Sequence, residues 1–355
     1  MINRDQLISD IRTLKFFINK SLALSSADNE ISGFELAPCL IEASAHNSYV
    51  ETVSNKADTL YSRIKNSLTE MTTHSYLDQI KWLSKKFDWK DKNFVLAFDY
   101  TDEEFYGDVQ GLDIHGWKKS SAITGKFKFL TCSIISDDIP EKIPLLSLPI
   151  QIGHFKSYVI SHMLSLIKPH IGEVKLILFD RGFYDKNLMY ELIKLEDPFL
   201  IFVPKGKDKK EILYPMEEGE KFTLYWDNKV NKDKSNFKFE YFLTFMKQIY
   251  SKRADAYFDW VFASNVDTIS LDEIIKTYRK RWRIETGFRV QDEARIKCKS
   301  KEMKIRYFLF MVEQLLQTQW MCFHKKEVSF KRYLIELNET AKGYAKKPKA
   351  NYGKS

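Results

Sequence analysis

The stretch VKLILFDRGFYD, residues 174–185, joins a short apolar run to an aspartate, Asp180, and then to Gly182, which permits a tight exit. Short apolar runs rich in β-branched and aromatic residues predict β-strands. Three more runs of this kind are NFVLAF (residues 93–98), KFKFLTCSII (126–135) and PFLIFV (198–203). Together they predict a sheet in the middle of the chain.

The intervals between these runs indicate how the sheet is connected. Residues 150–171 and 185–195 are amphipathic and long enough for crossover helices, so the sequence predicts an α/β fold with a mixed sheet flanked by helices. Three further strand-like runs follow one another between residues 205 and 267 without a good helix. We interpret this stretch as a β-rich insertion in a core formed by residues 91–204 and 268–325.

Residues 1–90 carry helical periodicity and little strand signal, with turn-forming residues at 25–33 and 72–75. We expect a separate helical domain here. Residues 34–45 and 56–68 are compatible with a helix-turn-helix whose second helix enters the major groove of DNA. The basic residues of that second helix are Lys56, Arg63 and Lys65. Two helices that merely pack in a core explain the same pattern equally well.

The composition narrows the class of protein. Lysine and arginine outnumber the acids by 56 to 48, which gives a formal charge of +8 and favours a polyanionic partner. The four cysteines have no C-x-x-C spacing and the seven histidines do not cluster, so neither a zinc enzyme nor a disulfide framework is indicated. A reducing cytoplasm is expected. The basic residues 341–355 predict a flexible tail.

No membrane segment is expected. The most apolar late stretch, residues 307–320, is interrupted by Glu313 and three glutamines and therefore predicts a packed helix. The first 20 residues alternate charged and apolar side chains and lack the continuous apolar run of a signal peptide. A phosphate-binding G-x-x-x-x-G-K-[ST] motif is also missing from the sequence.

Three carboxylates stand out as candidate catalytic groups. Asp99 and Asp180 each end an apolar run, and strand-end aspartates project into the crevice where α/β sheets bind ligands. Either aspartate, taken singly, could also be explained as a turn residue or a helix cap.

A helix face carries the third candidate carboxylate. In the stretch 274–289, Tyr278, Arg281 and Glu285 fall on one helix face because successive residues turn by roughly 100°. A surface salt bridge is the alternative. The apolar residues around that face favour a buried Glu285 that needs a partner, such as a metal ion.

These elements resemble a known family, the DDE insertion-sequence transposases with a ribonuclease-H-like core. The resemblance is to the group with a tyrosine, arginine, glutamate and lysine signature on its last catalytic helix, and it spans residues 90–325. The matching residues, in order, are Asp99 with Thr101, the D-R-G-F element of Asp180, Arg181, Gly182 and Phe183, and then Tyr278, Arg281 and Glu285. Residues 303–320 resemble the closing helix, and the β-rich stretch before Glu285 also matches.

One position departs from the signature. The family lysine falls on Asp292, so a phosphate contact from that position is in doubt, and Arg289 or Lys297 could substitute for it.

The resemblance implies a cytoplasmic, nucleoid-associated prokaryotic DNA transposase. It implies that Asp99, Asp180 and Glu285 bind Mg²⁺, which Mn²⁺ replaces, and that they cut the transposon ends and join the 3′ hydroxyl to target DNA by two-metal phosphodiester transfer. Tyr278 and Arg281 would contact the DNA backbone, and Trp226 is a candidate for stacking on a displaced base.

Further expectations concern the partners of the protein and its rival functions. The expected partner is double-stranded DNA, as inverted repeats and as target, bound by a dimer on paired ends. Two alternatives remain open, namely a ribonuclease-H-like nuclease without strand transfer and a catalytically retired DNA-binding protein.

Overall fold

The computed structural model describes residues 2–24, 32–116, 122–136, 142–204, 221–227, 238–251 and 255–345. The chain divides into two compact units. The first unit contains residues 1–83, 143–149 and 286–355, and the second contains residues 84–142 and 150–285. The boundary near residue 84 lies close to the expected one near residue 90, but the first unit also includes the last 70 residues of the chain.

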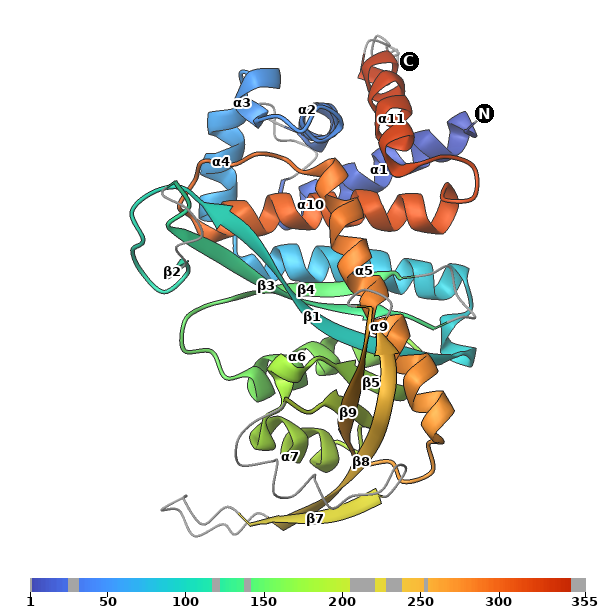
Figure 1. Cartoon of the computed structure of the whole chain (residues 1–355). Coiled ribbons are helices and arrows are strands. Elements are labelled where there is room, and N and C mark those ends of the chain that lie inside the picture. Colours follow the sequence, from blue (N-terminus) through green and yellow to red (C-terminus); the bar gives the residue numbers. More distant parts are fainter. Residues whose placement is uncertain are drawn as a thin grey trace. The chain divides into compact units, whose positions relative to one another are not determined.

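An eight-stranded path forms the sheet of the second unit, in the order β2-β3-β1-β5-β6-β9-β8-β7 (Figure 1). Its strands are β1 Asn93–Phe105, β2 His115–Gly116, β3 Gly125–Ile134, β5 Glu173–Phe179, β6 Phe199–Phe202, β7 Lys221–Asp227, β8 Lys238–Ser251 and β9 Ala256–Ser264. The central strands β1, β5 and β6 are parallel, and the outer pairs are antiparallel. The sheet is therefore mixed, as expected.

The stretch interpreted as an insertion continues this sheet. β9 pairs with β6 through Leu200 and Ser264, and β8 then pairs with β9. Hydrogen bonding along the edge of β6 thus brings these strands into the same sheet as the strands that carry Asp99 and Asp180.

Helices cover both faces of the sheet. The crossover helices are α6 Lys156–Ile167 and α7 Lys186–Lys194, and α9 Leu271–Gln291 follows β9 (Figure 1). Tyr190 of α7 packs on Phe239 of β8, whereas Tyr278 of α9 packs on Phe262 of β9. Phe262 of β9 lies opposite Thr244 of β8, so these two side chains point to the same face of the sheet. Thr244 is an odd number of residues from Phe239 along β8, and side chains alternate between faces, so Phe239 points to the other face. α7 and α9 therefore lie on opposite faces.

The first unit is built almost entirely from helices. They are α1 Arg4–Ser21, α2 Gly33–Ala45, α3 Val50–Val53, α4 Ala57–Asn66, α5 Thr69–Lys86, α10 Met303–Phe323 and α11 Phe330–Ala345, with the strand β4 Pro144–Ile150. Nearly every residue of α10 is buried. Polar side chains of α10 find partners, since Gln314 accepts a hydrogen bond from Ser147 and Glu313 accepts one from the backbone of Ile296 at 2.7 Å. Among the described residues, no helix has the length and apolarity needed to span a bilayer.

Two local expectations were wrong. Residues 72–75 lie inside α5 and not in a turn, because the Ser75 hydroxyl bonds to the Met71 carbonyl and Thr73 bonds to the buried Tyr307 hydroxyl at 2.9 Å. Residues 341–345 belong to α11, where Ala341 is fully buried, so the tail cannot begin at 341. Residues 346–355 lie outside the described residues.

We expect the packing between α1 and α10 to hold the first unit together. Phe17 is 0% exposed and its ring lies 5.8 Å from that of Phe308, whereas the neighbouring Phe16 is 52% exposed. Phe17→Ala should lower the free energy of unfolding by about 3 to 5 kcal/mol, because it removes a buried ring and leaves a cavity. Phe16→Ala should cost about 0.5 kcal/mol or less. Urea denaturation of both variants checks this, and equal losses would contradict it.

Candidate active site

Strand register brings the two aspartates together. Phe98 of β1 pairs with Phe179 of β5 in the last parallel pair, so the next residue of each strand, Asp99 and Asp180, lies beside the other. Asp180 leaves the sheet there and precedes the short 3-10 helix Arg181–Phe183. Asp99 was expected to end its strand, but β1 continues past it to Phe105 and pairs with β3. The sequence expectation missed this since residues 99–104 are mostly polar.

The α9 helix contributes the remaining site residues. Tyr278 sits in an aromatic cluster with Phe202, Trp260 and Phe262, with ring distances of 5.6, 6.1 and 4.8 Å. Its hydroxyl donates a hydrogen bond of 3.3 Å to Oδ1 of Asp180. This packing fixes the rotation of α9, so that the next residues along the same face point toward the aspartates.

Arg281 binds all three carboxylates. Nη1 lies 3.0 Å from Oδ2 of Asp99, while Nη2 lies 3.8 Å from Oδ1 of Asp180 and 3.5 Å from Oε1 of Glu285. The side chain of Arg281 is only 3% exposed, and its buried Nε has no hydrogen-bond partner among the described residues. A single guanidinium thus gathers the three predicted acids within one cluster.

Burial is the largest influence on the pKa values of the cluster. Burial raises the pKa of Asp99 to about 6, although Arg281 and the backbone amide of Tyr100 oppose the shift. Burial lowers the pKa of Arg281, but the Tyr278 phenol and the carboxylates outweigh it and leave this pKa raised. Burial also raises the pKa of the Tyr278 phenol, which stays protonated as a donor.

Glu285 differs from the expectation of a buried acid. Its side chain is 48% exposed, and Oε1 lies 3.5 Å from Nη2 of Arg281. The helix turns its apolar residues Ile274 and Ile284 into the core and leaves Glu285 at the edge of the cluster. An exposed carboxylate on a helix can change rotamer at little cost.

The donor set suits a hard divalent cation, which prefers oxygen ligands. In the described residues no group of three or more His, Cys, Asp or Glu side chains has the arrangement of a metal site. The cation that the carboxylates surround is the guanidinium of Arg281, which stands in for a metal charge. A metal bound by Asp99 and Asp180 would require Arg281 to withdraw and Glu285 to turn inward.

Arg281 and Tyr278 were expected to contact DNA, yet both are almost fully buried and face the acids. The other candidate DNA ligands lie in the first unit. Arg289, Lys65 and Lys297 are exposed, while Arg63 and Lys56 are half-buried, and Lys56 forms an ion pair with Glu35. Asp292, which replaces the family lysine, is exposed. The side chain of Trp226 lies outside the described residues.

Two lysines, Lys128 and Lys156, contact residues near Asp99 and Asp180. The ammonium of Lys128 lies 4.7 Å from the centre of the Tyr100 ring, which stacks on Phe183 at 4.8 Å. Lys156, at the start of α6, donates a hydrogen bond of 2.6 Å to the Gly182 carbonyl. The sequence did not single out Lys156, because no motif distinguishes a lysine that opens a helix.

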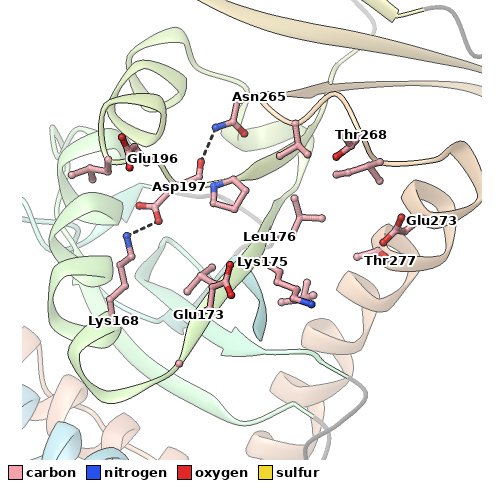
Figure 2. A pocket seen from close by; sticks show the side chains of 17 residues that line it. Lys168, Glu173, Lys175, Leu176, Glu196, Asp197, Asn265, Thr268, Glu273 and Thr277 are labelled. Atoms are coloured by element: carbon pink, nitrogen blue, oxygen red, sulfur yellow. Dashed lines mark hydrogen bonds and ion pairs between the residues drawn. The ribbon is translucent and has the colours of Figure 1, made fainter. Parts of the chain in front are cut away.

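A hollow lies at the end of the parallel strands opposite the three acids (Figure 2). Its volume is about 920 Å³, and Glu173, at the amino end of β5, lines it. Asp197 there binds Lys168 at 2.6 Å, and Asn265 donates to the Asp197 carbonyl at 2.9 Å. The Asn265 hydrogen bond ties the start of β6 to the end of β9, and the ion pair ties the start of β6 to the short helix Lys168–His170. None of the three candidate catalytic acids lines this hollow.

The raised pKa of Asp99 predicts a pH-dependent stability. Because the folded pKa of about 6 exceeds the ordinary value of 3.8, the folded protein gains stability from protonated Asp99 that is lost as the pH rises through about 6. The loss amounts to about 3 kcal/mol at most. With chelator present, Asp99→Asn should therefore gain stability relative to the wild type between pH 4.5 and 7. The exposed Asp108→Asn should follow the wild type, and parallel curves for Asp99→Asn would refute the shift.

Comparison with known proteins shows what the chain resembles. Residues 157–309 match the family described as a transposase DDE domain. No curated protein matches the chain in sequence. A solved structure of piggyBac transposase, in a synaptic complex with hairpin DNA, is similar in fold, with a TM-score of 0.53 and 11% identity, over 97% of this chain and 80% of that one. The chain therefore shares its overall fold with that transposase, and residues 157–309, which include Asp180 and Glu285, resemble the transposase DDE domain.

Proposed function

We propose that the protein cleaves the ends of an insertion sequence and joins the freed 3′ hydroxyl to target DNA. The observation that carries this proposal is the cluster of three carboxylates around Arg281, contributed by two adjacent strands and one helix. Carboxylates that converge from different elements are what phosphodiester transfer needs, because the protein supplies positioned charge and little covalent chemistry.

Asp99 and Asp180 would hold the divalent metal, and Glu285 would complete its ligands by turning inward. Bound there, Mg²⁺ would activate the attacking hydroxyl and stabilise the departing oxygen, and Mn²⁺ would substitute for it. In this proposal the Tyr278 hydroxyl orients Asp180 through their 3.3 Å hydrogen bond. Arg281 balances the charge of the acids and contacts the DNA backbone once they release it.

The helical first unit would recognise the DNA end. α2 and α4 have the order of a helix-turn-helix, with the short α3 between them, and Lys65 is exposed on α4. The piggyBac neighbour is a synaptic complex with hairpin DNA, which supports DNA as the partner. A dimer on paired duplex ends is part of the proposal. Deletion of this region is a poor test, because its helices share a core with α10 and α11.

The helix face makes a sharp prediction about Glu285. Glu285→Gln keeps the shape but removes a charge that binds metal, so Mg²⁺-dependent cleavage of an end-containing duplex should fall by several orders of magnitude. Binding of the same duplex should remain close to that of the wild type. Glu273→Gln, an exposed glutamate on the same helix, is the matched control and should cleave normally. Normal cleavage by Glu285→Gln would end the catalytic assignment.

Arg281→Ala should behave differently. It leaves three carboxylates without their common cation, so like-charge repulsion should lower the stability of the metal-free protein, and Mg²⁺ should restore it. A structural salt bridge on a solvated helix would instead cost about 0.5 kcal/mol with no response to Mg²⁺. Thermal unfolding with and without Mg²⁺ separates these cases.

Joining distinguishes a transposase from a nuclease. A labelled duplex with a pre-cleaved 3′ end should be joined to a circular target plasmid in Mg²⁺, which gives labelled products longer than the substrate. The same duplex with a 3′-deoxy end lacks the attacking hydroxyl and should give none. A nuclease would only shorten the label, and a retired DNA-binding protein would bind both duplexes without changing either.

A further inference from the structure

The connection between α9 and α10 carries lysines at every second position. In the stretch KCKSK, residues 297–301, the three lysines are exposed, whereas Cys298 and Ser300 are half-buried. Alternation with a period of two is the signature of an extended backbone, in which every second side chain points the same way. Lys297, Lys299 and Lys301 therefore form a row, named here the lysine ladder.

Hydrogen bonds with α10 and with the residues after α2 fix the backbone of the lysine ladder. The buried Arg306 of α10 donates from Nη2 to the Cys298 carbonyl at 3.0 Å and from Nε to the Ser300 carbonyl at 2.8 Å. The backbone amide of Lys297 donates to the Ser48 carbonyl at 3.0 Å, beside a β-bridge to Tyr49. The extended conformation is thus fixed before any ligand arrives, which lowers the entropic cost of binding.

The spacing fits a nucleic-acid strand. Residues two apart in an extended segment are separated by roughly 6.6 Å, which is comparable with the separation of successive phosphates along one strand. We propose that the lysine ladder binds consecutive phosphates of one strand of duplex DNA. A row of ammonium groups on a fixed backbone gives affinity without reading sequence.

Neighbouring residues place the ladder beside α4. Lys299 and Lys65 line the same hollow of about 460 Å³, and Lys304 donates to the Lys65 carbonyl at 3.3 Å. Glu51 and Asp58 also line that hollow, so the phosphate contacts belong to the lysines and not to the hollow itself. The inference rests on the proposed function for its choice of DNA, and it adds Lys299 and Lys301 as contact residues.

The salt dependence of binding tests the ladder. Each phosphate contact contributes about 0.9 to the slope of log affinity against log salt concentration. Changing Lys297, Lys299 and Lys301 together to Gln should reduce that slope by about 2 to 3 for a short duplex of arbitrary sequence, measured on the full chain without metal. Affinity in about 0.1 M salt should fall on the order of 100-fold. The triple change to Arg should keep both values.

A matched control separates position from total charge. Arg12, Lys81 and Lys326 are exposed residues of the same unit, and their triple change to Gln removes the same charge. This control should keep the wild-type slope. An unchanged slope in the ladder variant, an equal loss in the control, or no duplex binding by the wild type would each overturn the ladder. Failure of the proposed catalysis would instead appear as wild-type binding without Mg²⁺-dependent cleavage.

Discussion

The guanidinium of Arg281 is the constraint on which the site depends. Register between β1 and β5 forces Asp99 and Asp180 next to each other, and like charges at short range in a partly buried place repel. Arg281 offsets this repulsion from within hydrogen-bonding distance of Asp99. Because Arg281 is buried, α9 can be placed in only one rotation, and the aromatic packing of Tyr278 selects the same one.

Much of the second unit could be predicted from the sequence, because its signals are local. Apolar runs became β1, β3, β5 and β6, amphipathic intervals became α6 and α7, and the helix spacing of Tyr278, Arg281 and Glu285 put them on one face. The order of the strands was not predictable. That order depends on hydrogen bonds between edges far apart in sequence, such as the pairing of Ile201 with Ala263.

In the first unit, the partners of buried polar residues could not be predicted from the sequence. Asp10 is buried and accepts hydrogen bonds from the Tyr333 hydroxyl at 3.1 Å and from Nε2 of His324 at 2.8 Å, more than 300 residues along the chain. A polar residue on an apolar helix face gives no sign of such distant partners. The same is true of Arg306, whose sequence neighbours suggested only a closing helix, while its contacts shape the segment before that helix. Burial of polar groups follows from tertiary partners, which periodicity does not reveal.

The charges of the cluster indicate what it is built to accept. With Arg281 withdrawn to make room for metal, the ionised Asp99, Asp180 and Glu285 carry three negative charges, which one divalent cation would offset only in part. A second such cation would leave a positive excess that only an anionic ligand could balance. In the proposed function, the phosphates of DNA would supply that anion. Metal and DNA would therefore favour each other at this site. Burial, which raises the pKa of Asp99 to about 6, favours the neutral carboxyl only below that pH.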